Sequence, residues 1–514
     1  MKFLDEWDRR LARLSEERFY FVLLAVMATL VTALVMGLAL ILHRNFLTIA
    51  CDTAAIQNAI VNTLHGNWFR DTAYDGPNLL GLHTMLVLVL IAPIYAMFPY
   101  PETLFILQVV GIYSAVIPLY LVAVEILRRP LVAFLIAATM LASPLLLHMA
   151  MAPFHPESWI LAAVLWSYYF YRRNQSLRFW ISFAIAVTSG EQAALIYAAL
   201  GLSLLLADDG IAWRKRYGWW ALGAGLSCFL FSVEILIPLM RTPEQHNLLG
   251  YHYAGWNADS VSQLASALIQ DPFRTVSMLL APMRWAHVIS LVGLPLLLVF
   301  LSRRGLALLL PFPIYFLMSD QEFYLYFHAY YYQFALFAGY MALVFFLARW
   351  EVSTRLGLMV LIGTFFMNAL LVCPVMGFYT GLAMGRDDAL SSGLHEAFDK
   401  IPPDAAVYSP HRYSAYLSNR TNLVMGDLYD KNFDFKAMLD ANFATTNVHP
   451  EQIDYIVSDL QNDQCGWRQG GYNPDATKLR ADTINHLLKS GQWQIFWNQS
   501  NIVILKRIGS DASL

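Results

Sequence analysis

The sequence predicts a mainly helical protein that crosses a membrane many times and carries a small α/β domain at its C-terminal end. Of its 514 residues, 58% are hydrophobic and only 14% are charged, and the mean hydropathy is +0.47. One soluble core cannot bury that much apolar surface, so most of it must face lipid. From about residue 386 the charge content becomes that of a soluble domain. We therefore expect a transmembrane domain over residues 1–385 and an outer α/β domain over 386–514.

Charge and cysteine content exclude two other classes. The formal net charge of -3 gives no basic face for nucleic acid. The cysteines form no CxxC or zinc-like spacing, so we expect no disulfide framework; they are Cys51, Cys228, Cys373 and Cys465.

The first membrane crossing is expected at residues 20–43. The charged, amphipathic segment before it is followed by an apolar run that is too long for a signal peptide, and no convincing cleavage site follows. Arginines before a span tend to stay in the cytoplasm; here they are Arg9, Arg10, Arg13 and Arg18. The N-terminus is therefore expected inside and Asp52 outside.

The segment after this crossing predicts an interfacial helix. Its apolar residues repeat every four positions while polar ones take the other face, as in Gln57, Asn58, Asn62 and His65. Asp52 stands at the expected N-cap, where a carboxylate accepts backbone N–H bonds. A simple capping role and a functional role both remain open for it.

The next apolar stretch, 83–98, is expected to be re-entrant or to lie on the surface, because a crossing there would place Arg128 and Arg129 outside. With that assumption all later basic loops fall inside. Residues 179–206 must then leave and return as two short helices turning at 189–192. The other helices are expected at 103–127, 131–149, 157–171, 218–240, 286–301, 305–318, 330–348 and 356–380. This gives about eleven crossings and an outer C-terminus.

The C-terminal domain shows the patterns of strands and a helix. "AAVYSP" and "IDYIVSD" alternate as strands do, "TKLRADTINHLLKSG" has a helical period with a glycine stop, and "WQIFWNQSNIVILKR" predicts a closing hairpin. The domain contains no GxGxxG, P-loop or Ser-His-Asp pattern. We expect it to shape or cover a site rather than to perform chemistry.

The ionisable residues that this topology gathers on the outer side predict the functional site. They are Asp52, His83, His155, Glu157, Glu191, Glu322 and His328. Ionisable groups near hydrocarbon are costly and mark substrate or ion paths. Each also has a simpler interpretation: a cap, a turn or, around His328, an interfacial aromatic belt. Their types suit a divalent metal, which is left open, but no short ligand spacing such as HExxH occurs.

The order of these features resembles the GT-C superfamily of integral-membrane glycosyltransferases, and more narrowly a bacterial family of predicted membrane proteins of unknown function related to it. The resemblance covers most of the chain and rests on "CDTAAIQNAIVNTLHGNWF", "LGLHTMLVLVLIAPIY", "LFILQVVGIYSAVIPLYLVA", "PFHPESW", "SGEQAAL", "YFHAYYYQF" and the tail "IPPDAAVYSPHRYSAYLSNR".

The resemblance implies an activity. In the superfamily an early outer-loop Asp serves as catalytic base or metal-site carboxylate, which implies that role for Asp52, and the donor is a polyprenyl-phosphate sugar. Asp52 would take the proton of the acceptor hydroxyl, and Arg70 or another outer arginine, such as Arg241 or Arg284, would stabilise the leaving phosphate. The surrounding substrate-binding residues would be His83, His155, Glu157, Glu191 and His328.

Two other classes stay open. A non-catalytic lipid-sugar transporter or binding protein would use the same cluster for recognition, although no inverted repeats stand out. A structural subunit of an envelope complex would use the outer domain for docking. All three interpretations imply a protein of the bacterial inner membrane, with membrane lipids as partners.

Overall fold

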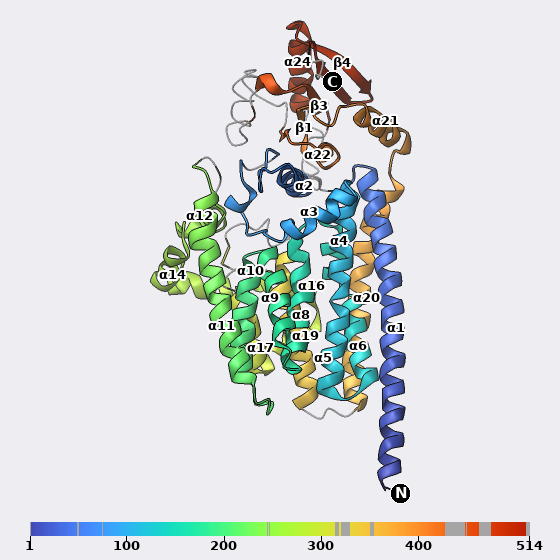
Figure 1. Ribbon diagram of the computed structural model, residues 1–514, viewed down its shortest axis with the longest axis vertical. Coiled ribbons are helices and arrows are strands. Elements are labelled where there is room, and N and C mark those ends of the chain that lie inside the picture. The colour runs from blue at the N-terminus through green and yellow to red at the C-terminus, as the bar shows by residue number, and fades with distance from the viewer. Residues whose placement is uncertain are drawn as a thin grey trace.

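The protein is a long bundle of helices with a small sheet at one end (Figure 1). The computed structural model describes residues 2–48, 51–73, 76–243, 245, 247–313, 318–319, 329–349, 354–426, 448, 450–461 and 474–509. Helix α1 (Lys2–Arg44) runs along the whole bundle, and the N-terminus lies at the end opposite the sheet.

The helices follow the apolar runs of the sequence. The first group is α2 (Cys51–Leu64), α3 (Leu88–Met97), α4 (Pro101–Ser114), α5 (Val116–Leu127), α6 (Pro130–Leu141), α7 (Pro144–Met151), α8 (Ile160–Arg172), α9 (Ser176–Ser189) and α10 (Gln192–Leu205). The second group is α11 (Arg214–Phe231), α12 (Ile237–Met240), α13 (Leu248–His252), α14 (Val261–Gln270), α15 (Pro272–Leu279), α16 (Pro282–Val292), α17 (Arg303–Leu309), α19 (Gln333–Arg349) and α20 (Thr354–Met384).

Fewer helices are long enough to span a membrane than the sequence led us to expect. Among the described residues five pass by length and composition, or six if the bent pair α6–α7 counts as one; the five are Ser15–Arg44, Pro101–Leu127, Arg214–Met240, Pro272–Val292 and Met359–Met384. The remaining expected crossings correspond to shorter apolar helices. Their number of about eleven therefore stays an expectation.

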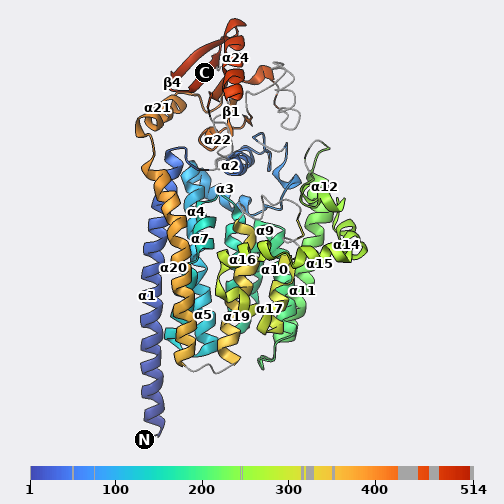
Figure 2. The same ribbon diagram turned by 180° about the vertical axis from the view of Figure 1, so that it is seen from behind.

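The long helices differ in how much of their apolar surface they bury. Only 22% of the most apolar window of α1 is buried, and 17% of that of α20, which lies beside α1 (Figure 2). Their exposed apolar surface is what lipid contact requires. In contrast, α10 and α19 are buried over most of their length. A Cβ added to Gly225 of α11 would lie 2.5 Å from the Ala194 carbonyl oxygen of α10, so small residues allow this close packing.

The prediction of two unusual segments is supported. Residues 83–98 contain only the ten-residue helix α3, which is too short to span, and α4 and α5 together form the next long segment. Residues 179–206 form α9 and α10, which turn at Gly190 and Glu191. The expected single helix over 286–301 is wrong, because α16 ends at Val292 and a 3-10 helix follows Gly293, whose φ is 83°.

Helix α2 is buried within the protein, whereas the expected interfacial helix would expose its polar face to water. Eleven of its fourteen residues are buried, including its amides. The Asn58 side chain donates to the carbonyl oxygen of Arg420 at 2.8 Å, and that of Asn62 donates to the carbonyl oxygen of Thr421 at 3.1 Å. The helical period gives the polar face correctly. That face pairs with a distant part of the chain instead of with water.

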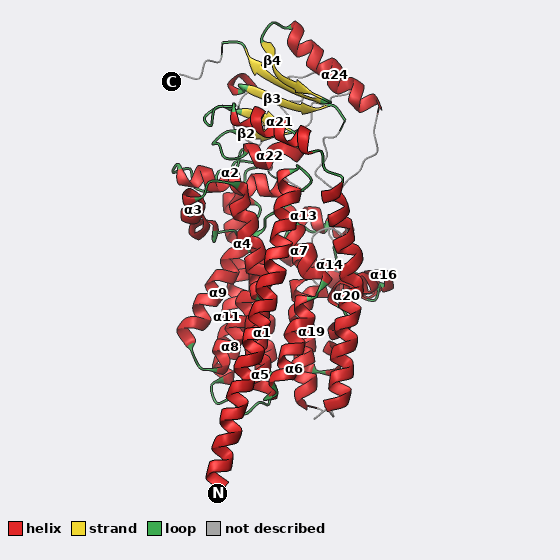
Figure 3. Cartoon of the chain, turned by 90° about the vertical axis from the view of Figure 1, so that its right-hand side faces the viewer, coloured by secondary structure: helices red, strands yellow, loops and turns green. Residues whose placement is uncertain are grey.

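The C-terminal part forms a five-stranded mixed sheet, which we call the cap (Figure 3). Its strand order is β2-β1-β3-β5-β4, with β1 (Val407–Ser409) parallel to β2 (Leu423–Met425) and β3 (Tyr455–Asp459). The hairpin of β4 (Trp493–Gln499) and β5 (Ile502–Arg507) adds to β3 antiparallel. The helices of this part are α21 (Asp388–Asp399), α22 (His411–Leu417) and α24 (Pro474–Lys489). The predicted strands, helix and hairpin are therefore confirmed.

The cap is attached to the bundle through the residues between α1 and α3, which we call the first loop segment. The Met425 amide of β2 donates to the Ala73 carbonyl at 2.8 Å, and the Leu423 amide donates to Thr72 Oγ1 at 3.0 Å. One hydrophobic cluster joins Phe46 and Ala54 to the cap core. Polar and apolar contacts thus both connect the first loop segment to the cap.

Cys51 is disulfide-bonded, whereas Cys228 and Cys373 are free. No disulfide framework was expected, and the cysteine spacing did not single out this bond.

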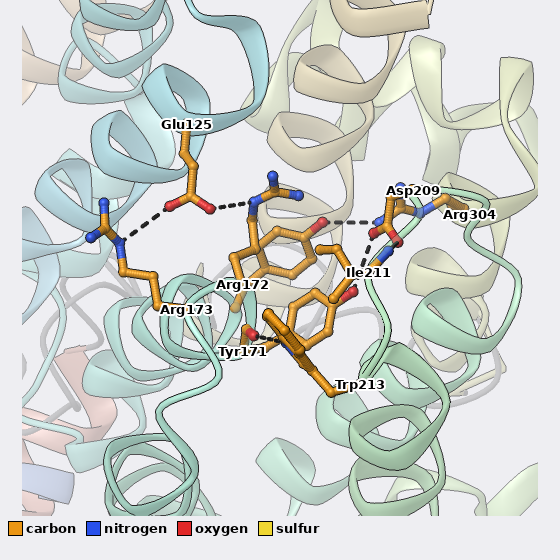
Figure 4. A network of polar contacts seen from close by, with 9 residues as sticks. Glu125, Tyr171, Arg172, Arg173, Asp209, Ile211, Trp213 and Arg304 are labelled. Carbon is orange, nitrogen blue, oxygen red and sulfur yellow. Dashed lines mark hydrogen bonds and ion pairs between the residues drawn. The ribbon is translucent and has the colours of Figure 1, made fainter.

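At the other end, the basic loops gather in one polar network (Figure 4). Glu125 pairs with Arg172 at 3.0 Å and with Arg173 at 3.3 Å. Asp209 accepts from the Tyr171 hydroxyl at 3.2 Å. The predicted gathering of basic loops away from the cap is supported for the described loops.

Candidate functional site

Five of the predicted site residues meet at the cap end of the bundle. Each comes from a different stretch of chain, apart from the neighbours in the turn before α8; they are Asp52, His83, His155, Glu157 and Glu191. We call them the acid–imidazole cluster. The other two outer candidates, Glu322 and His328, lie outside the described residues.

Asp52 lies in the first turn of α2, because that helix begins at Cys51. This corrects the expected N-cap. Its Oδ2 lies 3.6 Å from Nε2 of His155, whose side chain is only 7% exposed while that of Asp52 is 29% exposed. Thr53 Oγ1 accepts from the Phe154 amide, and Gln108 accepts from the His155 amide, each at 2.8 Å. These two bonds fix the turn that presents His155 to Asp52.

The hydrogen bonding of His155 determines where its protons lie. Nδ1 is 2.9 Å from the Pro153 carbonyl oxygen, which can only accept, so Nδ1 carries a proton. Nε2 faces the Asp52 carboxylate at 3.6 Å, which is beyond hydrogen-bond distance, so the two side chains interact electrostatically.

His83 and Glu191 form the second pair. Nδ1 of His83 lies 3.1 Å from Glu191 Oε1, and the Thr84 amide donates to Glu191 Oε2 at 3.1 Å. Burial alone would lower the pKa of His83, but Glu191, with smaller effects of Glu157 and Asp52, outweighs it and raises the pKa to about 9. Burial would raise the pKa of Glu191, yet His83 and the amide hold it below its usual range. This pair is therefore ionised at neutral pH.

Glu157 differs from the other carboxylates. It is fully buried in the 3-10 turn Pro156–Trp159, and no other residue that the structure describes forms a hydrogen bond with its carboxylate oxygens. Burial raises its pKa, against the opposing effects of His155 and His83. A buried charge without a partner is costly, so this side chain needs an explanation.

A cavity of about 330 Å³ opens beside the His83–Glu191 pair. Its apolar wall comes mainly from α11, α12 and the π-helical turn between them, with Leu82, Phe229, Val233, Ile237 and Pro238. Its ionisable lining residues are His83, Glu191, Glu234, Arg241, His252 and Asp259. Of the segment 83–98, only His83 lines it. The cavity thus combines an apolar side with a polar side, as a site for an amphipathic ligand requires.

The arginines named from the sequence have different positions. Arg241 lines the cavity. Arg70 does not; its Nη2 donates to Asn422 Oδ1 at 3.4 Å, next to β2, and partial burial lowers its pKa. Arg284 donates to the Ser319 carbonyl at 2.9 Å. Asp52 and His155 also lie outside the cavity lining.

Several polar residues of this region were not predicted. Gln192, next to Glu191, is buried with both side-chain amide atoms unpaired, and Oγ1 of Thr84 is also buried without a partner. His252 lines the cavity, and burial lowers its pKa to about 4. Its sequence context "LLGYHYAGW" carries no pattern that would have singled it out. Among the described residues no group of three His, Cys, Asp or Glu side chains could hold a metal ion.

These features define the class: a helical membrane protein with a buried acid–imidazole cluster beneath a small mixed sheet. The chain belongs to the predicted membrane protein family DUF2079, which matches residues 42–504. The expected family is thereby confirmed. No curated protein matches the chain.

Two solved structures are similar to it. ArnT from Cupriavidus metallidurans bound to undecaprenyl phosphate is 12% identical, with a TM-score of 0.48, over 95% of this chain and 98% of that one. The same enzyme in the apo state is 13% identical, with a TM-score of 0.44, over 93% and 98% of the two chains.

Proposed function

We propose that the protein is a GT-C type glycosyltransferase that moves a sugar from a polyprenyl-phosphate carrier to an acceptor at the outer face of the bacterial inner membrane. The observation that carries this proposal is the joining of two features: a buried acid–imidazole cluster, and an adjacent cavity with one apolar and one polar side. A lipid-linked phosphate sugar has the matching chemistry.

Asp52 is the proposed catalytic base. Glu191 is only 6% exposed and is committed to His83 and the Thr84 amide, whereas the Asp52 side chain is 29% exposed. The more accessible carboxylate is the one that can reach an acceptor hydroxyl. His155 would then receive or share the proton, since its Nε2 faces Asp52.

The phosphate of the donor is proposed to lie beside His83 and Arg241. Both line the cavity, and both carry positive charge at neutral pH. They would stabilise the negative charge that builds on the leaving phosphate. The apolar side chains of α11 and α12 would contact the prenyl chain. The proposed surrounding contacts to sugar and acceptor are His155, Glu157, Glu191, His328 and Arg70.

Two observations support the proposed orientation, with the N-terminus in the cytoplasm and the cap outside. Cys51, at the cap end, is disulfide-bonded, and disulfides persist in oxidising compartments such as the periplasm. The described basic loops gather at the opposite end, and basic loops tend to stay in the cytoplasm.

One observation favours a second function, lipid-sugar binding without chemistry. Asp52 and His155 are not among the residues that line the cavity, so a ligand held there need not contact them. In that case the His83–Glu191 pair and Arg241 would serve recognition alone.

The test is transfer by the purified protein in proteoliposomes, with a radiolabelled polyprenyl-phosphate sugar and extracted envelope acceptors. We expect turnover by the wild type and a loss of about 100-fold or more in Asp52→Asn, because amide nitrogen cannot accept the proton. Asp208→Asn is the matched control, since Asp208 is 78% exposed at the opposite end. Full transfer by Asp52→Asn would exclude it as the base. Ligand binding without turnover would favour the second function.

A further inference from the structure

Glu157 stands out because its turn is fixed while no other described residue forms a hydrogen bond with its carboxylate. The turn around it is fixed: the Gln333 side chain donates to the Glu157 carbonyl at 2.8 Å, and the Ser158 amide donates to the His155 carbonyl at 3.0 Å. Both carboxylate oxygens are nevertheless buried and without a hydrogen-bond partner. Mobility of the turn therefore does not explain why the carboxylate lacks a partner.

A polar side chain close to Glu157, that of Gln192, is also buried without a hydrogen-bond partner among the described residues. Glu157 and Gln192 meet at Gly190, where an added Cβ would lie 2.7 Å from Glu157 Cγ and 2.8 Å from Gln192 Oε1. Both amide atoms of Gln192 lack a partner. An ionised carboxylate can only accept, so it could use the amide nitrogen alone, whereas a carboxylic acid can donate to the amide oxygen and still accept.

The charged groups around Glu157 also favour its neutral form. The titratable groups that act on it are His155 from its own turn, His83 from the segment before α3 and Glu191 from the α9–α10 turn. His83 is committed to Glu191, and His155 faces Asp52. Each imidazole of the cluster thus already faces another carboxylate.

We propose that Glu157 is held as a neutral carboxylic acid against the Gln192 amide, and that its neutrality keeps the neighbouring cavity receptive to an anionic ligand. The second part rests on the proposed function. An ionised Glu157 would add a negative charge to the acid–imidazole cluster in a medium of low dielectric. That charge would repel a phosphate placed beside His83 and Arg241. Glu157 is therefore a positioning residue that acts through the charge balance of the cluster.

The first part is tested by infrared difference spectroscopy on the full-length protein in detergent. We expect a protonated-carboxyl band at neutral pH that is absent in Glu157→Gln. In Gln192→Leu the band should persist but shift, because its hydrogen-bond acceptor is lost. If Glu157→Gln keeps every protonated-carboxyl band of the wild type, the proposal is overturned. A Gln192→Leu spectrum identical to that of the wild type would also overturn it. This experiment requires no sugar transfer, so it can succeed where the proposed function fails.

The second part is tested by the binding of polyprenyl phosphate over a pH series. The affinity of each protein is compared with its own value at neutral pH. As pH rises, the wild type should lose affinity more steeply than Glu157→Gln, because only the wild type can ionise Glu157. An equal pH dependence of the two proteins, or a steeper loss in Glu157→Gln, would overturn the proposal.

Discussion

The two ends of the bundle both contain polar clusters, but they satisfy their carboxylates differently. At the basic end Glu125 forms ion pairs with two arginines, although its Oε2 makes no hydrogen bond with the described residues, and Asp209 accepts from a tyrosine hydroxyl and from the Ile211 amide. At the cap end Glu157 has neither an ion pair nor a hydrogen bond with the described residues, and Glu191 relies on one imidazole and one amide. Interactions that serve only stability leave few buried groups unsatisfied. The incomplete pairing at the cap end therefore indicates a site for an additional ligand or proton.

The largest expected effect on stability comes from breaking the His83–Glu191 pair. His83→Asn leaves Glu191 as a buried carboxylate without its cation, which costs about 3 to 5 kcal/mol of unfolding free energy. Thermal unfolding in detergent would measure it. The Asn419 side chain donates to the Pro99 carbonyl at 3.2 Å and accepts from the Tyr95 hydroxyl at 3.5 Å, so Asn419→Ala is a control that removes neutral hydrogen bonds at the cap end. An unfolding midpoint of His83→Asn equal to that of the control would show that the pair contributes little.

The His83–Glu191 pair also predicts that the stability of the protein depends on pH. The pKa of His83 is raised to about 9 in the folded protein, so its stabilisation is fully present below its ordinary value of about 6.5 and is lost as pH rises through about 9. The difference in midpoint between wild type and His83→Asn should therefore shrink across that range. A difference that is constant up to and beyond about 9 would contradict the ion pair.

The next effect is on ligand binding. Arg241→Gln should weaken polyprenyl phosphate binding by about 10- to 100-fold, because a hydrogen bond to a charged group contributes about 1.5 to 3 kcal/mol. Arg274→Gln is the matched control, since Arg274 belongs to α15 and does not line the cavity. If the two variants bind polyprenyl phosphate equally, the phosphate does not contact Arg241.

A smaller effect concerns the attachment of the cap. Asn58 accepts from the Thr72 amide at 2.8 Å and donates to the Arg420 carbonyl at 2.8 Å, so Asn58→Ala leaves two buried backbone groups unpaired. We expect a loss of about 1 to 3 kcal/mol and faster proteolysis of the cap. The exposed Asn67→Ala is the control. Wild-type resistance in Asn58→Ala would show that the apolar contacts alone hold the cap.

The smallest effect is expected at the basic end. Arg303 and Asp208 pair at 2.7 Å, but their side chains are 69% and 78% exposed. Arg303→Gln should cost about 0.5 kcal/mol or less. A loss comparable to that of His83→Asn would remove the contrast between the two ends.

The sequence predicted most of the membrane part because its signals are local. Apolar length, helical period and basic loops depend on neighbouring residues, and they correctly gave α4–α5, the α9–α10 turn and the strands of the cap. They also brought Asp52, His83, His155, Glu157 and Glu191 to one end, since all of them follow from sidedness alone.

The errors arose where distant segments meet. The amide face of α2 was expected to face water because nothing in the local sequence shows that Arg420 and Thr421 supply its acceptors. The apolar wall of the cavity comes from α11 and α12, far along the chain from His83, and no period relates them.

The most direct measurement is an electron cryo-microscopy map of the full-length protein in lipid nanodiscs containing polyprenyl phosphate. The proposed site predicts phosphate density within contact of His83 and Arg241, with the prenyl chain along α11 and α12. Phosphate density at another position, with this cavity empty, would contradict it.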